Sequence, residues 1–387
     1  MAKDSHFFAP TGGRRKALVP AGIPLLLAML AIFFGSRALA QTATPGTTDP
    51  SQPFFAPAPP AGFDPVRASD ADLRTYGFPP RPPLISTAYA GWVKMVTAAR
   101  APVANPTLRR TNVIHGPARN LVRIVGVANT TYQSQQWSGI GVTGASGYFK
   151  ANNSYVVGEF PGVPAIYTSV EDCKYGPYYA TMWVGLDGYG SASGDVLQVA
   201  VNLVACGNGT PPYQAWFEWN TADCNNGQYA CSEVTIGGFQ VNQGDVLFVV
   251  VTYYTTSPNG NAYFVNYSTG QYTSVLFNEP SPTNYQYKGE TAEWIVERPL
   301  GANCAGPGGG VCDLTDYAPF YMEGTYNGIL PGSGPESGPD YFVMFCPNWN
   351  PVSACQSNTV LSSVTQYVPT SGQIFFTPAG PATQYIP

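Results

Sequence analysis

Two segments of the sequence place polar and aromatic side chains on one face of a predicted strand. Residues 196–203 alternate along the chain, so that Leu197, Val199, Val201 and Leu203 share one face, and Val196, Gln198, Ala200 and Asn202 the other. Residues 213–219 alternate in the same way and place Trp216 and Glu218 on one face. If the two strands are neighbours, they present an amide, an indole and a carboxylate on one surface. Such a surface suits the binding of an extended polar polymer.

A further strand carries carboxylates. In residues 290–299, Glu293, Ile295 and Glu297 share a face. The ordinary interpretation of an acidic strand face is contact with solvent. The functional interpretation is general acid–base catalysis, because a carboxylate can take a proton from water and pass it to a leaving group.

Several common catalytic sites are excluded by the residues available. The chain has two histidines, His6 and His115, and a Ser-His-Asp or Cys-His site would depend on His115 alone. Sequence patterns of serine hydrolases, zinc peptidases, phosphate-binding loops and the usual aspartic peptidases are missing. We expect no metal and no organic cofactor, since no cysteine spacing resembles a zinc site. Acid–base chemistry would therefore fall to carboxylates and amides.

The N-terminus has the layout of a secretory signal peptide. A basic cluster at residues 14–16 precedes an apolar run, and Ala38-Leu39-Ala40 offers a cleavage site. We therefore assign residues 1–40 to a signal peptide and expect a secreted protein, extracellular or periplasmic. After cleavage we expect no membrane attachment.

Residues 41–125 form a basic, proline-rich extension before an acidic domain. They carry nine Lys/Arg and four Asp, whereas residues 126–387 carry four Lys/Arg and eighteen Asp/Glu. The acidic domain would repel phosphates, so no nucleic-acid partner is expected. Prolines crowd residues 45–83, which predicts an extended or disordered segment rather than a packed one. Residues 87–96 are more apolar and could form one short element.

This extension has two interpretations. It is a linker or stalk, or it is a prosegment that masks the acidic domain. In the second case acid would neutralise carboxylates, loosen the contact and allow self-cleavage near Val125. High salt would also weaken a contact held by charge.

The eight cysteines all follow residue 170. An even number behind a signal peptide argues for disulfides. Close spacing favours three local pairs and leaves a fourth, namely Cys224–Cys231, Cys304–Cys312, Cys346–Cys355 and Cys173–Cys206.

The remainder of the chain is predicted to be all-β. Gly, Pro and aromatic residues are abundant and only 11% of residues are charged. Strand-like runs separated by turn residues predict a sandwich or barrel. They are residues 139–142, 154–157, 179–184, 196–205, 215–219, 246–254, 262–267, 274–278, 292–297, 341–345, 360–366 and 373–377.

The order of the motifs resembles the glutamic peptidases, or eqolisins. The similarity extends over residues 130–375. It is carried by Trp183-Val184-Gly185-Leu186-Asp187-Gly188, Val196-Leu197-Gln198-Val199, Tyr213-Gln214-Ala215-Trp216-Phe217-Glu218-Trp219, Gln243-Gly244-Asp245 and the run 291–299, with a weaker match at Trp137-Ser138-Gly139.

The resemblance implies an antiparallel β-sandwich of two seven-stranded sheets, similar to lectin-like jelly rolls of the concanavalin A type. It also implies a substrate cleft on the concave face, a catalytic pair, Gln198 and Glu297, and a disulfide Cys304–Cys312. We expect the two catalytic side chains to meet in a shared groove with room for one water molecule between them. The cleft residues that it implies are Trp137, Trp183, Asp187, Trp216 and Glu218.

The sequence departs from the family pattern at positions that border the cleft. Asn202 and Gln214 stand where aspartate is common, Asn220 replaces a tyrosine and Pro299 an aromatic residue. The resemblance therefore predicts a secreted, acid-active endopeptidase, monomeric, acting on polypeptides and masked by its own prosegment. The competing hypotheses are a non-catalytic lectin-like module that stacks sugars on aromatic rings and a structural envelope protein.

Overall fold

The computed structural model describes most of the chain after the predicted signal peptide. The described residues are 52–378, with gaps at 119–120, 126–129, 146, 152, 168–176, 191–193, 208, 222–230, 281–286, 302–303, 305–309 and 346–359. They belong to one compact unit. The predicted signal peptide lies outside them. No helix among them is long and apolar enough to cross a membrane.

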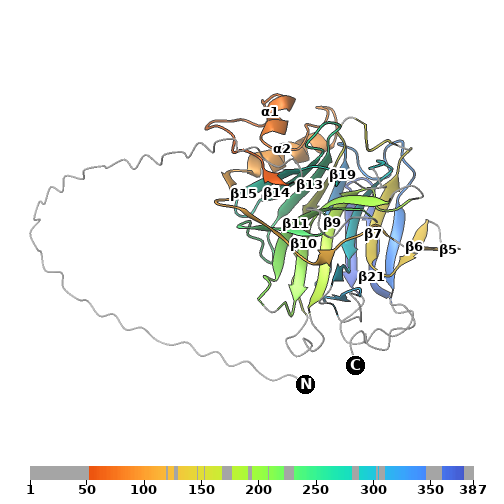
Figure 1. Ribbon diagram of the computed structural model, residues 1–387. Coiled ribbons are helices and arrows are strands. Elements are labelled where there is room, and N and C mark those ends of the chain that lie inside the picture. Colours follow the sequence, from red (N-terminus) through yellow and green to blue (C-terminus); the bar gives the residue numbers. More distant parts are fainter. Residues whose placement is uncertain are drawn as a thin grey trace, which may run out of the picture. The chain divides into compact units, whose positions relative to one another are not determined.

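The first of two antiparallel sheets contains the strands predicted to carry the site (Figure 1). Each strand pairs with the next in the spatial order that follows. This order is β12 (Val234–Gly237), β11 (Tyr213–Thr221), β10 (Asp195–Ala205), β9 (Tyr178–Leu186), β16 (Thr291–Glu297), β7 (Trp137–Thr143) and β20 (Asp340–Phe345).

The second sheet is also antiparallel throughout and lies against the first. Its strands, in spatial order, are β21 (Val360–Val368), β22 (Gln373–Pro378), β19 (Phe320–Tyr326), β8 (Tyr155–Phe160), β13 (Leu247–Tyr253), β14 (Gly260–Asn266) and β15 (Gln271–Phe277). Because β20 pairs with β21, the two sheets are joined along one edge. The predicted β-sandwich is confirmed.

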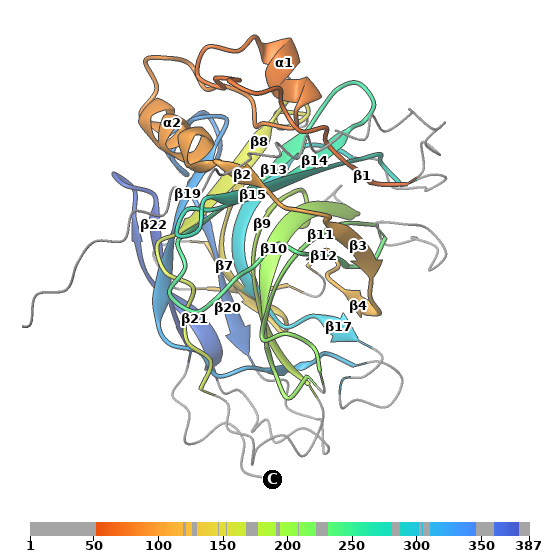
Figure 2. The same cartoon turned by 90° about the vertical axis from the view of Figure 1, so that its left-hand side faces the viewer.

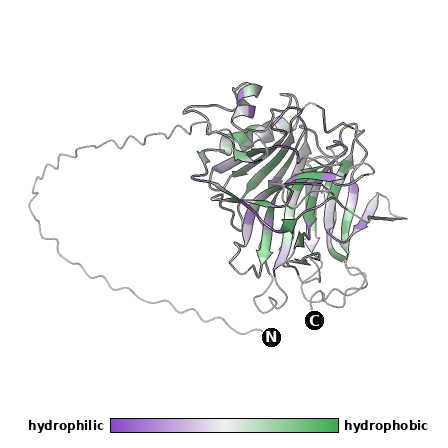
Figure 3. Ribbon diagram, in the orientation of Figure 1, coloured by the Kyte–Doolittle hydropathy of each residue, from purple (hydrophilic) through white to green (hydrophobic). Residues whose placement is uncertain are grey.

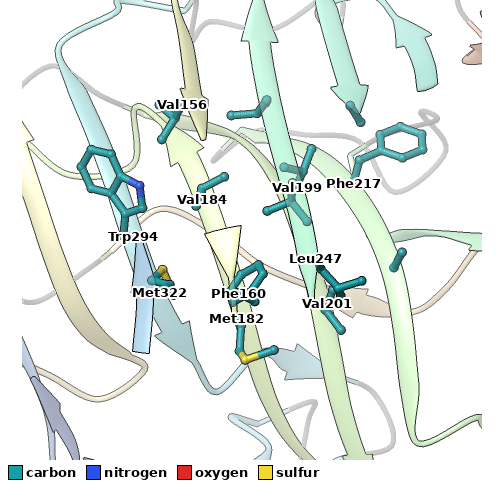
Figure 4. Packing of buried hydrophobic residues seen from close by; sticks show 14 of the residues in the cluster. Val156, Phe160, Met182, Val184, Val199, Val201, Phe217, Leu247, Trp294 and Met322 are labelled. Atoms are coloured by element: carbon teal, nitrogen blue, oxygen red, sulfur yellow. The ribbon is translucent and has the colours of Figure 1, made fainter. Parts of the chain in front are cut away.

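The core lies between the two sheets. Figure 4 shows Val184 and Val199 of the first sheet packed with Val156 and Leu247 of the second. Figure 3 shows hydrophobic residues along these central strands. On β10, Leu197, Val199, Val201 and Leu203 enter this core, while Val196 and Ala200 lie on the opposite face, to which Gln198 also belongs, so the predicted alternation is confirmed. We call that opposite face of the first sheet the site face.

Further short strands pair with strands of the two sheets or with each other. They are β1 (Phe54–Phe55), β2 (Ala101–Pro102), β3 (Thr107–Arg110), β4 (Val113–Ile114), β5 (Val122–Ile124), β6 (Thr131–Ser134), β17 (Leu300–Gly301) and β18 (Asp313–Leu314). Of these, β4 and β17 pair with each other as a separate two-stranded sheet. Five of the short strands, β1 to β5, come from the N-terminal extension. The sequence did not predict these short strands, nor β12 and β19.

The N-terminal extension is packed against the sandwich from residue 52 onward. It contains α1 (Asp70–Thr75) and α2 (Ala88–Ala98), which lie over the outer face of the second sheet (Figure 2). The expectation of an extended or disordered segment is therefore wrong for residues 52–83. The predicted short element at residues 87–96 is confirmed as α2.

Apolar contacts explain why the proline-rich extension packs. Phe78, Trp92 and Met95 are buried in one cluster with Phe248 and Tyr263 of the second sheet. Burial of such side chains stabilises by roughly 1.5–3 kcal/mol each. The prolines end or separate the elements while the aromatic residues between them bury apolar surface.

Charge plays a smaller part in this packing. The ion pair between the extension and the second sheet is Lys94 with Glu159, at 2.5 Å and partly exposed. Exposed pairs contribute about 0–1 kcal/mol. Attraction between basic and acidic parts is therefore secondary to apolar burial at this face.

One predicted disulfide lies wholly among the described residues and is confirmed. Cys304 and Cys312 are bonded. Cys206 and Cys231 are also disulfide-bonded. The predicted pairs Cys224–Cys231, Cys346–Cys355 and Cys173–Cys206 each involve a residue outside the described part of the chain, so they stay predictions.

Candidate active site

Gln198 and Glu297 both lie on the site face, on strands separated by β9. The ladder aligns Glu297 with Thr181 and Asn202, four residues along β10 from Gln198. Both side chains are fully buried. In the full chain, the place where a shared groove is expected is therefore covered. What covers these side chains is a segment of the extension rather than the second sheet.

We call residues 107–118 the covering segment. Its first part, β3, pairs with β12, and β4 pairs with β17. Between them, the Thr111 amide donates to the Glu233 carbonyl, and the Glu233 amide donates to the Val113 carbonyl. Further on, the Ala118 amide donates to the Gly188 carbonyl at 2.7 Å. The covering segment therefore crosses the site face as an extended peptide fixed by backbone hydrogen bonds.

His115 lies at the centre of this contact. The Gln198 Nε2 amide donates to the His115 carbonyl oxygen. The His115 Nδ1 atom lies 3.1 Å from Glu297 Oε2. Its backbone amide donates to Glu218 Oε2 at 3.0 Å. The ring stacks on Trp216 with centroids 3.9 Å apart. One residue of the extension thus contacts both predicted catalytic groups.

The other ring nitrogen of His115 contacts a residue that the sequence interpretation missed. His115 Nε2 lies 3.2 Å from Glu233 Oε2. The same oxygen accepts from Asn202 Nδ2 at 2.6 Å, and Asn202 Oδ1 accepts from Trp216 and from Thr181, at 2.7 Å in each case. Asn202 therefore orients Glu233 toward the imidazole.

The missed residues gave weak signals in the sequence. Glu233 directly precedes the short strand β12, where no alternation marks a face. His115 was set aside because no triad could be built around it. Its position in a basic segment before an acidic domain was the available signal.

Three of the predicted cleft residues are tryptophans, and all lie on the site face. Trp183 Nε1 donates to Glu297 Oε2 at 2.8 Å. Trp137 packs edge-on against Trp183 with centroids 4.8 Å apart. Trp216 lies under the His115 ring. These indoles line the site face beside the predicted catalytic groups.

Asp187 is placed differently from the other predicted cleft residues. Its carboxylate accepts backbone N–H groups of residues 288–291, at 2.7–3.4 Å. Asp187 itself has a positive φ of 61°. It holds the turn before β16 in place and makes no hydrogen bond with Gln198, Glu297 or His115 among the described contacts.

Burial and charge act in opposite directions on the pKa values at this site. Burial lowers the pKa of His115, but Glu297 and hydrogen bonds to Glu233 and Glu297 outweigh it and raise that pKa to about 10. Burial raises the pKa of Glu297, an effect that His115 and the Trp183 hydrogen bond oppose. Burial likewise raises the pKa of Glu218, again opposed by His115. The imidazole is therefore protonated at neutral pH and is the counter-ion of the carboxylates around it.

Among the described residues, no group of His, Cys, Asp and Glu side chains is arranged to hold a metal ion. The site instead offers an amide donor, a carboxylate and a bound peptide carbonyl. That set can polarise a carbonyl and move a proton.

Comparison with known proteins supplies a family. The model of the "Peptidase A4 family" matches residues 135–329. No curated protein matches the chain.

Solved structures give more distant similarities. Scytalido-glutamic peptidase with a peptide-based transition-state analogue is 19% identical, covers 63% of this chain and 98% of its own, and has a TM-score of 0.44. SCP-B, an eqolisin in complex with the tripeptide Ala-Ile-His, is 17% identical with the same coverage and a TM-score of 0.39. An endo-1,3-beta-glucanase from Streptomyces sioyaensis is 13% identical, covers 59% and 90%, and has a TM-score of 0.32.

Proposed function

Because the chain belongs to the peptidase A4 family, whose members are glutamic peptidases, we propose that it is an acid-active endopeptidase in which Gln198 and Glu297 do the chemistry. The observation that supports this most is the peptide already lying on the site face. The carbonyl oxygen of His115 accepts from the Gln198 amide, and the Glu297 carboxyl contacts the same residue.

The proposed reaction follows from these two groups. Glu297, when ionised, takes a proton from a water molecule that attacks the peptide carbonyl. The Gln198 Nε2 amide donates to the oxyanion that forms, and removal of one such donor costs roughly 3 kcal/mol or more. The C–N bond then breaks, and Glu297 returns the proton to the leaving amine. A carboxylate can act as a base at acid pH, where a histidine would be protonated and could not.

We also propose that the covering segment keeps the full chain inactive. It occupies the position that a substrate peptide needs, and His115 engages both proposed catalytic groups. A peptide substrate can therefore bind only after the covering segment has dissociated from the site face. Self-cleavage near Val125 on acidification stays part of this proposal, as does the boundary between extension and domain at residues 125 and 126.

Secretion is the remaining part of the proposal. It rests on the predicted signal peptide and on the disulfide Cys304–Cys312, since disulfides persist in oxidising compartments. The polypeptide substrate and the monomeric state are proposed on the family resemblance.

The test is digestion of an unfolded protein such as casein across pH by the wild type and three variants. The wild type should cleave at acid pH, whereas Glu297→Gln and Gln198→Ala should lose at least a hundredfold in rate. Glu323→Gln, a carboxyl on β19 of the second sheet, is the matched control and should retain activity. Equal cleavage by Glu297→Gln would refute the assignment, provided that its melting temperature is that of the wild type.

No observation favours the alternative of a sugar-stacking module. The Trp183 indole donates to Glu297 and the Trp216 indole to Asn202, so both rings belong to the polar network around the proposed catalytic groups.

A further inference from the structure

Three side chains surround the His115 ring, Trp216, Glu233 and Glu297, and we call them the ring site. We infer that the ring site is the subsite for the residue whose carbonyl is attacked, and that Glu233 gives it a preference for a protonated histidine side chain. This inference rests on the proposed function. It adds a substrate class and a specificity-determining residue.

The register of the covering segment identifies the subsite. The carbonyl on the Gln198 amide belongs to His115 itself. In a substrate bound in this register, the same residue would place its side chain against Glu233 and its carbonyl at the proposed oxyanion donor. Water would add to that carbonyl carbon, the bond to the next residue would break, and a carboxylate and an amine would be released.

The ring site fits an imidazolium in both shape and charge. Trp216 stacks on the flat ring at an interplanar angle of 16°. Glu233 and Glu297 each lie within 3.2 Å of a ring nitrogen, one on each side. A phenylalanine would keep the stacking, but Glu297 would keep only the Trp183 donor and Glu233 would lose the charged imidazolium donor beside Asn202. Hydrogen bonds to charged groups contribute about 1.5–3 kcal/mol.

Glu233 can determine specificity without taking part in the reaction. Glu297 is committed to the reaction, and Glu218 contacts the backbone amide of His115, which every residue type except proline provides. Glu233 contacts the side chain. Its Oε2 is fixed by Asn202, and its Oε1 accepts from Thr111 Oγ1 at 3.1 Å.

The covering segment also identifies a second subsite, for the side chain two residues before the attacked carbonyl. Two residues before His115, Val113 is buried in a small apolar cluster with Tyr179, Val204 and the disulfide Cys304–Cys312. A substrate in the same register would place a small apolar side chain there. The test peptides should therefore carry valine two residues before the variable position.

The experiment measures how fast the full-length protein cleaves two peptide substrates. The protein is first incubated in acid until its activity is constant. The peptides share the sequence Val-Ile-X-Gly and differ in X, which is histidine or phenylalanine. At pH 5 the histidine peptide should have a kcat/KM about tenfold or more above that of the phenylalanine peptide. The advantage should fall about tenfold by pH 7.5, because a free imidazole loses its proton near ~6.5.

The matched variants are Glu233→Gln and Glu323→Gln. The first should reduce the histidine-to-phenylalanine ratio about tenfold, and the second should leave it unchanged. Equal cleavage of both peptides by the wild type, or an unaltered ratio in Glu233→Gln, would overturn the inference. The wild-type pH dependence decides even if Glu233→Gln does not fold.

The proposed function can fail separately. If the phenylalanine peptide is cleaved by the wild type and not by Glu297→Gln, the catalytic proposal holds whatever the ratio. If the wild type cleaves neither peptide nor casein, the proposed function fails and the subsite inference fails with it.

Discussion

His115 and Asn202 determine how the buried carboxyls on the site face are satisfied. The imidazole contacts Glu297 and Glu233, and the asparagine amide donates to Glu233. Aspartate, which the family resemblance leads one to expect at position 202, could not donate at neutral pH. The departure at Asn202 therefore has a physical reason in this chain, which is the presence of Glu233 2.6 Å away.

Asn202→Asp should destabilise the protein in a pH-dependent way. Two carboxyls would share one site, so ionisation of both would be costly. We expect a loss of about 2 kcal/mol at pH 7 that diminishes in acid, where one of the two carboxyls can take a proton. Thermal unfolding at pH 7 and pH 4 measures it. A loss that is the same at both pH values would contradict this explanation.

His115→Gln should lower the free energy of unfolding at acid and neutral pH but not near pH 10. The folded-state pKa of about 10 lies above the ordinary value of 6.5, so the stabilisation is complete below about 6.5 and is lost as pH rises toward 10. Wild type should exceed the variant by roughly 1–3 kcal/mol at pH 6. The two should converge near pH 10 in urea unfolding, and a gap that does not change with pH would show that the imidazole is not charged in the folded chain.

At the scale of elements, the extension is held by two different contacts. The helix α2 packs by apolar burial on the second sheet, and the covering segment adds backbone pairing and the His115 ion cluster on the first. Salt screens exposed charges but not buried apolar contacts. We therefore expect the extension to stay docked at high salt, in contrast to the expectation from net charge alone.

Trp92→Ala should loosen α2 without touching the site. Removing a buried tryptophan costs roughly 3–5 kcal/mol, and Trp92 is 4% exposed. Limited trypsin digestion should then cut the extension at Arg100, Arg109 or Arg110 faster than in wild type. Ile85→Ala is the control, because Ile85 is 98% exposed and its loss should change nothing. Equal digestion of both variants would mean that α2 does not anchor the extension.

For the whole molecule, the β-sandwich could be predicted from the sequence, whereas the path of the covering segment over the site face could not. Alternation in residues 196–203 identified both the core face and the site face, because one face of each strand must be buried. The path of residues 107–118 depends on contacts with Glu233 and Gly188, far away in the sequence, which no local pattern reveals. The same limit explains why Glu233 was missed. The hydrogen bonds of Asp187 to residues 288–291 also join segments far apart in the sequence, so no local pattern predicts them.

His115 of the extension contacts both groups that we propose hydrolyse peptides. The initial rate of peptide cleavage by freshly diluted full-length chains at acid pH tests this role, for wild type, His115→Ala and His115→Ala with Glu297→Gln. We expect a lag for wild type, immediate cleavage by His115→Ala and none by the double variant. A lag in His115→Ala equal to that of wild type, or a double variant as active as His115→Ala, would contradict it.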